Sequence, residues 1–221
     1  MKDSFANADK APSCWLVGAG GFGREVASWA QNATSGPTDA ARLAFIDDDP
    51  DLVGQNRLGV PIDGTIADLT TASGGSFAIT IGTSVLRRQI ADTLTEAAVS
   101  PVCLLHPSVA PDPTVDIGAG TILCARVTPT VNVRIGCHVI VNLHATIGHD
   151  AVLGDFVTLH PGVHVSGHVV IGEATEIGTG AVLLPGVTVG ANVRVGAGAV
   201  VTSDVPDGET VVGVPARATM H

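Results

Sequence analysis

The chain has 221 residues, of which 45% are hydrophobic but only 3% aromatic, and its net charge is −10. This acidity excludes a general nucleic-acid-binding protein, because phosphate recognition requires a basic surface. No apolar run reaches 18 residues, so insertion into a membrane is not expected. The four cysteines contain no CxxC pair, which favours a reducing, cytoplasmic location.

Residues 1–12 lack an apolar leader segment and are expected to form a flexible tail. Residues 13–104 then alternate between strand-like and helix-like patterns. Strands are predicted at 13–20, 42–49, 76–82 and 99–105, and helices at 22–32 and 84–97. This order predicts an α/β, Rossmann-like domain of βαβ type, in which helices cover a small parallel sheet.

A glycine-rich turn joins the first predicted strand to the first helix. It fits the pattern G-x-G-x-x-G with Gly18, Gly20, Gly21 and Gly23. Asp47 and Asp48 follow at the end of the second strand, where acceptors read a ribose or a base. A redox dinucleotide fold requires more than the roughly 90 residues of this segment. A purely structural turn stays open, and a nucleotide-sugar pocket, with the diphosphate at the helix start, is favoured.

The second predicted domain, residues 105–221, repeats every six residues. From Leu105 to Val201 every sixth residue is aliphatic, apart from Pro111 and Pro129. Four residues after each of these lies only Val, Ala or Thr, and Gly is frequent directly after them. A helical period of 3.6 cannot keep such a column in place, so the segment predicts a parallel β-helix. Three hexads form one triangular coil, which stacks residues 18 apart at about 4.8 Å.

Residues 142–168 contain the densest group of ionisable side chains in these coils. His149 and Asp150 occupy an outward-facing corner, and the coil spacing stacks Gly167 on His149 and His168 on Asp150. Acyl transfer from a thioester requires a base and a donor to the oxyanion, and a histidine beside a glycine amide offers both. A solvated surface histidine and a zinc site are the alternatives. No two histidines lie 18 or 36 residues apart, so no metal site is expected.

These motifs resemble the hexapeptide-repeat sugar acetyltransferases, which include sialic acid O-acetyltransferases and nucleotide-4-amino-sugar N-acetyltransferases of the bacillosamine-pathway type. LVGAGGFGREV, FIDDDP and ITIGTSVLRRQI are similar to the nucleotide-binding domain of that family. The coils carry its motif Asn-x-x-Ala-x-x-x-His-Asp, with Asn142 first and His149 as the histidine. The resemblance extends from about residue 14 to Arg217. It implies a left-handed β-helix and a homotrimer with acyl-transfer sites between chains.

The resemblance also implies roles for individual residues. His149 is the general base, Asp150 orients or polarises its imidazole, and Asn142 helps to place the acceptor sugar. Gly167 matches a glycine whose amide receives the thioester carbonyl. Many relatives have a histidine nine residues after the base, whereas this chain has Thr158 there and His160 two positions later.

Two further positions are assigned to acetyl-CoA by resemblance. Gly178 lies in the segment that lines the pantetheine groove in relatives. Arg217 ends a sequence similar to the family's terminal GVPAK/R, where the basic residue meets a coenzyme A phosphate. The alternative for Arg217 is a solvated side chain where the solenoid ends.

The family resemblance implies an acetyl-CoA-dependent N-acetyltransferase acting on the amino group of a nucleotide-linked amino-deoxy sugar. A UDP-sugar is the favoured substrate, acetyl-CoA is the co-substrate, and no tightly bound cofactor is expected. Both substrates bind in a ternary complex and the acetyl group transfers directly. O-acetylation of sialic acid or a related sugar is one alternative. The other is a non-catalytic, trimeric nucleotide-sugar-binding scaffold, which has no need of the histidine motif.

Overall fold

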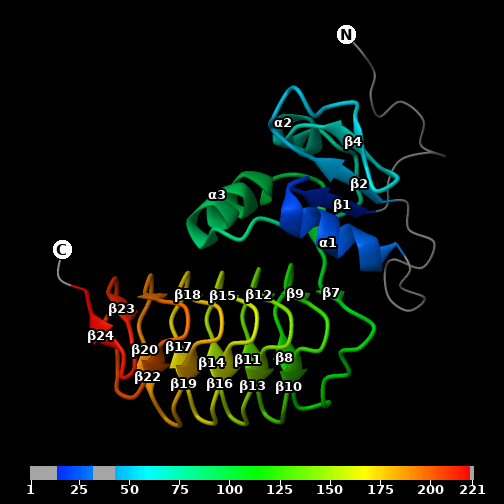
Figure 1. Ribbon diagram of the computed structural model, residues 1–221. Coiled ribbons are helices and arrows are strands. Elements are labelled where there is room, and N and C mark those ends of the chain that lie inside the picture. Colours follow the sequence, from blue (N-terminus) through cyan, green and yellow to red (C-terminus); the bar gives the residue numbers. More distant parts are fainter. Residues whose placement is uncertain (1–13, 32–42, 220–221) are drawn as a thin grey trace. The chain divides into compact units, whose positions relative to one another are not determined.

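A computed structural model describes residues 14–31 and 43–219 (Figure 1). The expected tail at residues 1–12 lies outside the described residues. Within the described part, the chain divides into two compact units. The first contains residues 14–31, 43–82 and 86–102, and the second contains residues 83–85 and 103–219.

The first unit is built on a six-stranded sheet with the order β3-β4-β2-β1-β5-β6. The strands are β1 (Cys14–Val17), β2 (Leu43–Ile46), β3 (Asn56–Arg57), β4 (Val60–Gly64), β5 (Ser76–Ile79) and β6 (Ser100–Pro101). All neighbours pair in parallel except β3 and β4, which form an antiparallel hairpin. Every residue of the two central strands, β1 and β2, is buried. Continuous apolar runs of this kind are typical of a parallel sheet covered on both faces.

Three helices belong to this part of the chain: α1 (Gly21–Ala30), α2 (Ile66–Thr70) and α3 (Ser84–Leu94). The predicted βαβ character is therefore confirmed. The hairpin of β3 and β4 and the helix α2 were not predicted, because elements of two to five residues are too short to show a clear period. The predicted strand at 99–105 is wrong as one element, because β6 pairs with β5 whereas Leu104–Leu105 (β7) pairs with β9.

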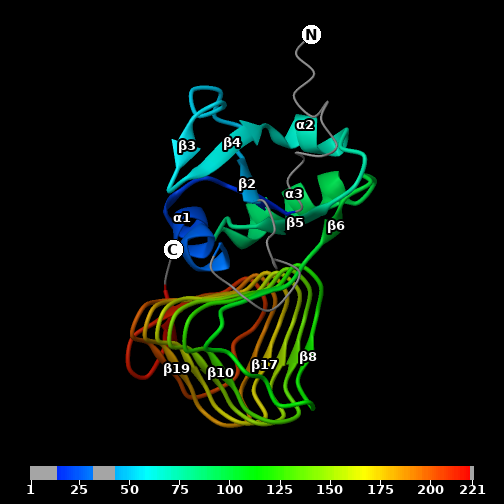
Figure 2. The ribbon, with the colours of Figure 1, turned by 90° about the vertical axis from the view of Figure 1, so that its right-hand side faces the viewer.

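The second unit is a parallel β-solenoid, as the hexads predicted (Figure 2). One ladder contains β10 (Thr128–Pro129), β13 (Thr146–Ile147), β16 (His164–Val165), β19 (Val182–Leu183) and β22 (Val200–Val201). A second contains β8 (Asp116–Ile117), β11 (Arg134–Ile135), β14 (Val152–Leu153), β17 (Val170–Ile171) and β20 (Thr188–Val189). The third contains β7, β9 (Ile122–Leu123), β12 (Ile140–Val141), β15 (Thr158–Leu159), β18 (Glu176–Ile177), β21 (Arg194–Val195), β23 (Thr210–Val212) and β24 (Arg217–Ala218).

Strand pairing has the predicted register of 18 residues, for example Ile140 with Thr158 and Thr146 with His164. The aliphatic residue of each two-residue strand points into the solenoid, and the small column of Val and Ala residues fills the space between. The glycine column has a packing reason. A Cβ atom at Gly148 would lie 2.6 Å from the backbone nitrogen of Gly167 in the next coil. The coils therefore stack closely only where this position has no side chain.

Candidate active site

Two successive coils bring His149, Asp150 and His168 together at one corner of the solenoid. His149 and Asp150 form the turn between β13 and β14, and His168 lies in the turn between β16 and β17. The backbone N–H of His168 donates to the His149 carbonyl at 2.9 Å. Asp150 and His168 both adopt the left-handed conformation, with φ of 61° and 60°. Asp and His tolerate this region better than most residues, so the corner geometry suits these side chains.

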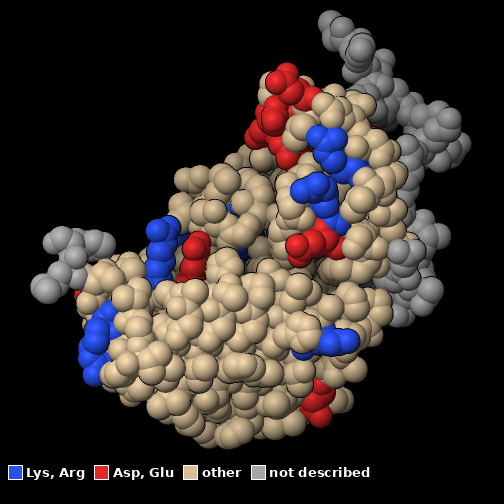
Figure 3. Space-filling model, viewed as in Figure 1, with Lys and Arg blue, Asp and Glu red and all other residues tan. Residues whose placement is uncertain are grey.

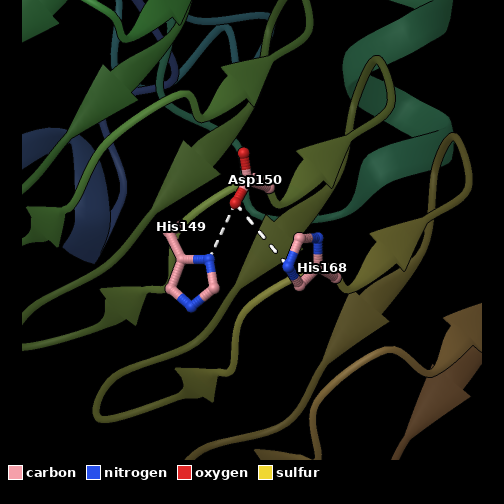
Figure 4. A group of neighbouring side chains, drawn as sticks. All are labelled: His149, Asp150 and His168. Atoms are coloured by element: carbon pink, nitrogen blue, oxygen red, sulfur yellow. Dashed lines mark hydrogen bonds and ion pairs between the residues drawn. The ribbon is translucent and has the colours of Figure 1, made fainter.

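The Asp150 carboxylate is the centre of this cluster (Figure 4). Its Oδ2 lies 2.7 Å from His149 Nδ1 and 3.7 Å from His168 Nε2, while its Oδ1 accepts from Asn132 Nδ2 at 3.2 Å. The hydrogen bond from His149, and then that from Asn132, hold the pKa of the Asp150 carboxyl below its ordinary value. An ionised carboxylate at Nδ1 favours the tautomer in which His149 Nε2 carries a lone pair.

Gly167 lies against the other side of the His149 ring. A Cβ atom at Gly167 would lie 2.6 Å from His149 Nε2. Any side chain at this position would therefore displace the imidazole. The Gly167 N–H donates to no acceptor among residues 14–31 and 43–219. A lone-pair nitrogen and an available N–H thus occur next to each other, as a base and an oxyanion donor must.

His168 contradicts the argument that excluded neighbouring histidines. The rings of His149 and His168 have centroids 5.0 Å apart in an edge-on arrangement. These residues are 19 apart in sequence, so the test for spacings of 18 and 36 missed them. Corner side chains point sideways from the turn and can meet a residue one position beyond their own column.

Asn142, His160 and Gly178 share a different corner from His149. They are spaced by 18 residues, and backbone bonds connect Asn142 to Leu159 and His160 to Ile177 at 2.9 Å each. The whole strand β13 separates Asn142 from His149. Within one chain the structure therefore does not bring Asn142 to the proposed base.

The other residues assigned to acetyl-CoA are also distant in register from His149. Thr158 lies in β15, paired with Ile140 and Glu176. A Cβ atom at Gly178 would lie 2.6 Å from the backbone nitrogen of Ala197, so this glycine has a packing role of its own. Arg217, in β24, is exposed and lines a cavity of about 460 Å³ near the end of the solenoid. Asp204 and Glu209 line the same cavity and offset its positive charge.

The first unit contains a cavity of about 870 Å³ at the carboxyl ends of β1 and β2. Gly18, Asp47 and Asp48 line it, as the sequence predicted for the nucleotide site. Polar and apolar residues of α2, α3 and the preceding turn complete the wall: Thr65, Ile66, Ala67, Thr70, Leu86, Gln89, Ile90 and Thr93. Sequence reasoning missed this wall, although Thr65 and Asp68 form a capping box that could have located α2.

The glycines of the turn have different structural roles. Gly18 has a φ of 108° and lines the cavity. Gly23 lies against the carbonyl oxygen of Gly18, where a Cβ atom has no room. Gly20 and Gly21 have open space around their Cα atoms, and neither they nor Gly23 line the cavity.

The two aspartates are engaged by the backbone. Asp47 accepts from the N–H of Ala19 at 2.8 Å through Oδ2 and from that of Asp49 at 3.0 Å through Oδ1. Asp48 Oδ1 accepts from the N–H of Ile66, at the start of α2, at 2.8 Å. Asp47 therefore ties the glycine turn to β2, and Asp48 has one oxygen without a printed backbone donor.

Comparisons with known proteins match both units. The family model described as PglD N-terminal domain matches residues 14–94. The model described as Bacterial transferase hexapeptide (six repeats) matches residues 168–203. None of the helices in the described ranges has the length and apolar character needed to cross a membrane.

One curated relative and two solved structures are closely similar to the chain. GDP-perosamine N-acetyltransferase from Escherichia coli O157:H7 is 35% identical over 150 residues, which covers 66% of this chain and 66% of that protein. The acetyltransferase domain of PglB from Neisseria gonorrhoeae FA1090 is 34% identical, with a TM-score of 0.85, covering 95% of this chain and 100% of that chain. PerB from Caulobacter crescentus, in complex with CoA and GDP-perosamine, is 31% identical, with a TM-score of 0.84, covering 94% and 97%. This chain belongs to the family of hexapeptide-repeat sugar N-acetyltransferases.

Proposed function

We propose that this protein transfers the acetyl group of acetyl-CoA to the amino group of a nucleotide-linked amino sugar. The observation that carries the proposal is the His149–Asp150 pair beside the N–H of Gly167. The relatives support the substrate class, since PerB was solved with CoA and GDP-perosamine and the PglB domain with acetyl coenzyme A.

In the proposed reaction both substrates bind in a ternary complex. The sugar amine attacks the thioester carbonyl carbon, and His149 Nε2 takes the proton that the nitrogen releases as the N–C bond forms. Asp150 holds Nδ1–H and stabilises the resulting imidazolium. The Gly167 N–H donates to the developing oxyanion. Collapse of the tetrahedral intermediate breaks the C–S bond, and the coenzyme A thiolate leaves and takes up a proton.

The separation of two corners supports a site shared between chains. Asn142 and His160 are at one corner and His149 is at another, so one chain alone cannot assemble the set that the family resemblance implies. In a homotrimer a neighbour supplies the second corner. The outward residues of β14, β17 and β20 are Val152, Val170 and Thr188, and charged side chains of the visible solenoid face gather toward its ends (Figure 3). An uncharged face suits packing against other copies.

The cavity of the first unit is the proposed nucleotide site. Its volume of about 870 Å³ is in the range of small-molecule sites, and Asp48 has a carboxylate oxygen available to a ribose or base. A UDP-sugar stays the sequence-based prediction for this pocket, while the relatives in complex carry GDP-perosamine. Four free cysteines support a cytoplasmic location for such an enzyme.

Incubation of the full chain with acetyl-CoA and a panel of UDP- and GDP-linked amino sugars tests the function, with products read by mass spectrometry. We expect a product heavier by one acetyl group, together with free coenzyme A. A substrate analogue with a hydroxyl in place of the amine should give no product. Transfer to that hydroxyl, or to free sialic acid, would favour O-acetylation instead, and binding without turnover would favour the scaffold.

The nucleotide site has a separate test in Asp48→Ala. This change should raise the KM for the nucleotide sugar about ten- to a hundredfold, because a hydrogen bond to a charged acceptor contributes about 1.5–3 kcal/mol. The KM for acetyl-CoA should stay unchanged. Asp47→Ala is the contrasting variant, since loss of two backbone contacts should reduce the stability of the unit. Equal effects of Asp48→Ala on both substrates would contradict the assignment.

A further inference from the structure

We propose that the corner cluster of His149, Asp150 and His168 is an inhibitory binding site for Zn²⁺. This inference goes beyond the proposed transfer reaction, and only its effect on activity rests on that function. His149 Nδ1, Asp150 Oδ2 and His168 Nε2 come from two adjacent coils. One ligand atom from each residue lies within 4.8 Å of the other two.

The distances fit a single small ion. Ligands of tetrahedral zinc at 2.0–2.1 Å are separated from one another by about 3.3 Å. The separations from Asp150 Oδ2 are 2.7 Å to His149 Nδ1 and 3.7 Å to His168 Nε2, which lie on either side of that value. The side chains of His149 and His168 are 57% and 65% exposed, so both rings can rotate by the small amount required.

The chemistry of the donors selects the metal. Two imidazoles and one carboxylate favour zinc and its transition-metal neighbours over Mg²⁺ or Ca²⁺, which prefer oxygen ligands. Three protein ligands leave the fourth position of a tetrahedral site open to water.

The backbone and Asn132 organise this set before any ion binds. The His168 N–H donates to the His149 carbonyl at 2.9 Å, and the Asp150 N–H donates to the Val131 carbonyl at 3.1 Å. Asn132 Nδ2 holds Asp150 Oδ1 at 3.2 Å, which leaves Oδ2 to face the two rings. Polar contacts of this kind orient a ligating carboxylate and increase metal affinity.

Binding of Zn²⁺ would remove the proposed base. The ion takes the lone pair of His149 Nδ1, so the remaining ring proton resides on Nε2. An Nε2–H group cannot accept the proton of the sugar amine. Zn²⁺ should therefore abolish turnover rather than support it.

The first test measures binding without activity. Full-length, untagged protein is stripped with EDTA, desalted and titrated with ZnCl₂ by calorimetry. His168→Asn is the matched variant, because asparagine also tolerates the left-handed corner. We expect one site per chain in the wild type and affinity at least about tenfold weaker in His168→Asn, since one of three ligands is lost. MgCl₂ should not bind. Equal Zn²⁺ affinity in wild type and His168→Asn would overturn the proposal.

The second test uses acetyl transfer. Zn²⁺ should inhibit the wild type, EDTA should restore activity, and His168→Asn should retain metal-free activity while resisting inhibition. Inhibition of both proteins by the same Zn²⁺ concentration would overturn the inhibitory role. If neither protein turns over any amino sugar but the calorimetric difference is present, the proposed function fails and the metal site stands.

Discussion

At the scale of single residues, the behaviour of His149 depends on what surrounds each ring nitrogen. Asp150 is hydrogen-bonded to Nδ1, and the bare Cα of Gly167 faces Nε2. The carboxylate fixes one tautomer, and the glycine leaves room for a thioester carbonyl. Neither effect requires the histidine to be buried, because its partners rather than desolvation select its state.

Removal of the base should be the most damaging single change. We expect His149→Ala to lower kcat by about 10²–10⁴, the usual contribution of a positioned general base. The KM for acetyl-CoA should change little, since His149 has no assigned contact with the coenzyme. His164→Ala, at an exposed strand position, is the control and should stay within a few-fold of wild type. Steady-state kinetics decide, and near-normal kcat in His149→Ala would remove this residue from the mechanism.

The titration of Asp150 provides a second prediction at this scale. Its pKa lies below the ordinary carboxyl value because the folded state favours the ionised form, so the carboxylate stays charged as the pH falls from 8 to 5. Asn132→Gly removes one hydrogen bond and should raise this pKa, and His149→Ala should raise it further. Carboxyl ¹³C NMR titration of aspartate-labelled protein measures the shift, with Asp150→Asn identifying the signal.

A matched glycine substitution tests whether the effect is specific. Asn192 also adopts the left-handed conformation at a corner, with φ of 56°, and has no contact with Asp150. Asn192→Gly should leave the Asp150 titration where it is. A similar shift in both variants would indicate a general change of the solenoid rather than the loss of one hydrogen bond.

At the scale of elements, each two-residue strand divides its side chains between the inside and the outside of the solenoid. Leu159 in β15 is completely buried, whereas Val170 in β17 is 40% exposed. The inward residue packs against the columns above and below it, while the outward residue leaves the core unchanged. Stability of the stacked coils therefore depends on one residue per strand.

Truncation of these two residues should have very different costs. Leu159→Ala should lower the free energy of unfolding by about 2–5 kcal/mol, because it removes buried methyl groups and leaves a cavity. Val170→Ala, the control, should lower it by less than about 1 kcal/mol. Urea unfolding followed by circular dichroism measures both. Equal losses would mean that the face of β17 is buried in solution, as it would be against another copy.

At the scale of the whole molecule, the division of the proposed site between corners requires more than one chain. Asn142 and His149 lie at opposite ends of the side formed by β13. A trimer would solve this geometrically, because the corner of one solenoid then faces a different corner of its neighbour. A cyclic assembly of this kind forms the same mixed site at each interface.

Mixed trimers test the shared site directly. Sedimentation should report about three times the chain mass of 22.2 kDa. Asn142→Ala and His149→Ala should each be inactive alone, whereas co-assembly of equal amounts should restore about one site in four. Recovered activity after joint refolding, but not after simple mixing of preformed trimers, is the expected pattern. Absence of recovery would place both residues in one chain or remove Asn142 from the site.

Much of the fold was determined by the sequence alone. A period of six with one large and one small apolar residue per strand is compatible with a β-solenoid and not with a helix. The same spacing placed Gly167 beside His149 and separated Asn142, His160 and Gly178 into a common column. These predictions succeeded because a regular repeat converts distance along the chain into position in space.

Only the tertiary structure decided contacts that the repeat does not encode. The approach of His168 to His149 and the hydrogen bond from Asn132 to Asp150 depend on left-handed corners, where side-chain direction follows torsion angles rather than the column of the Cα atom. The cavity wall from α2 and α3 depends on packing between short elements with little periodic pattern. Sequence spacing therefore determined which backbone positions stack, and the tertiary structure determined which side chains meet, because only the folded chain specifies their directions.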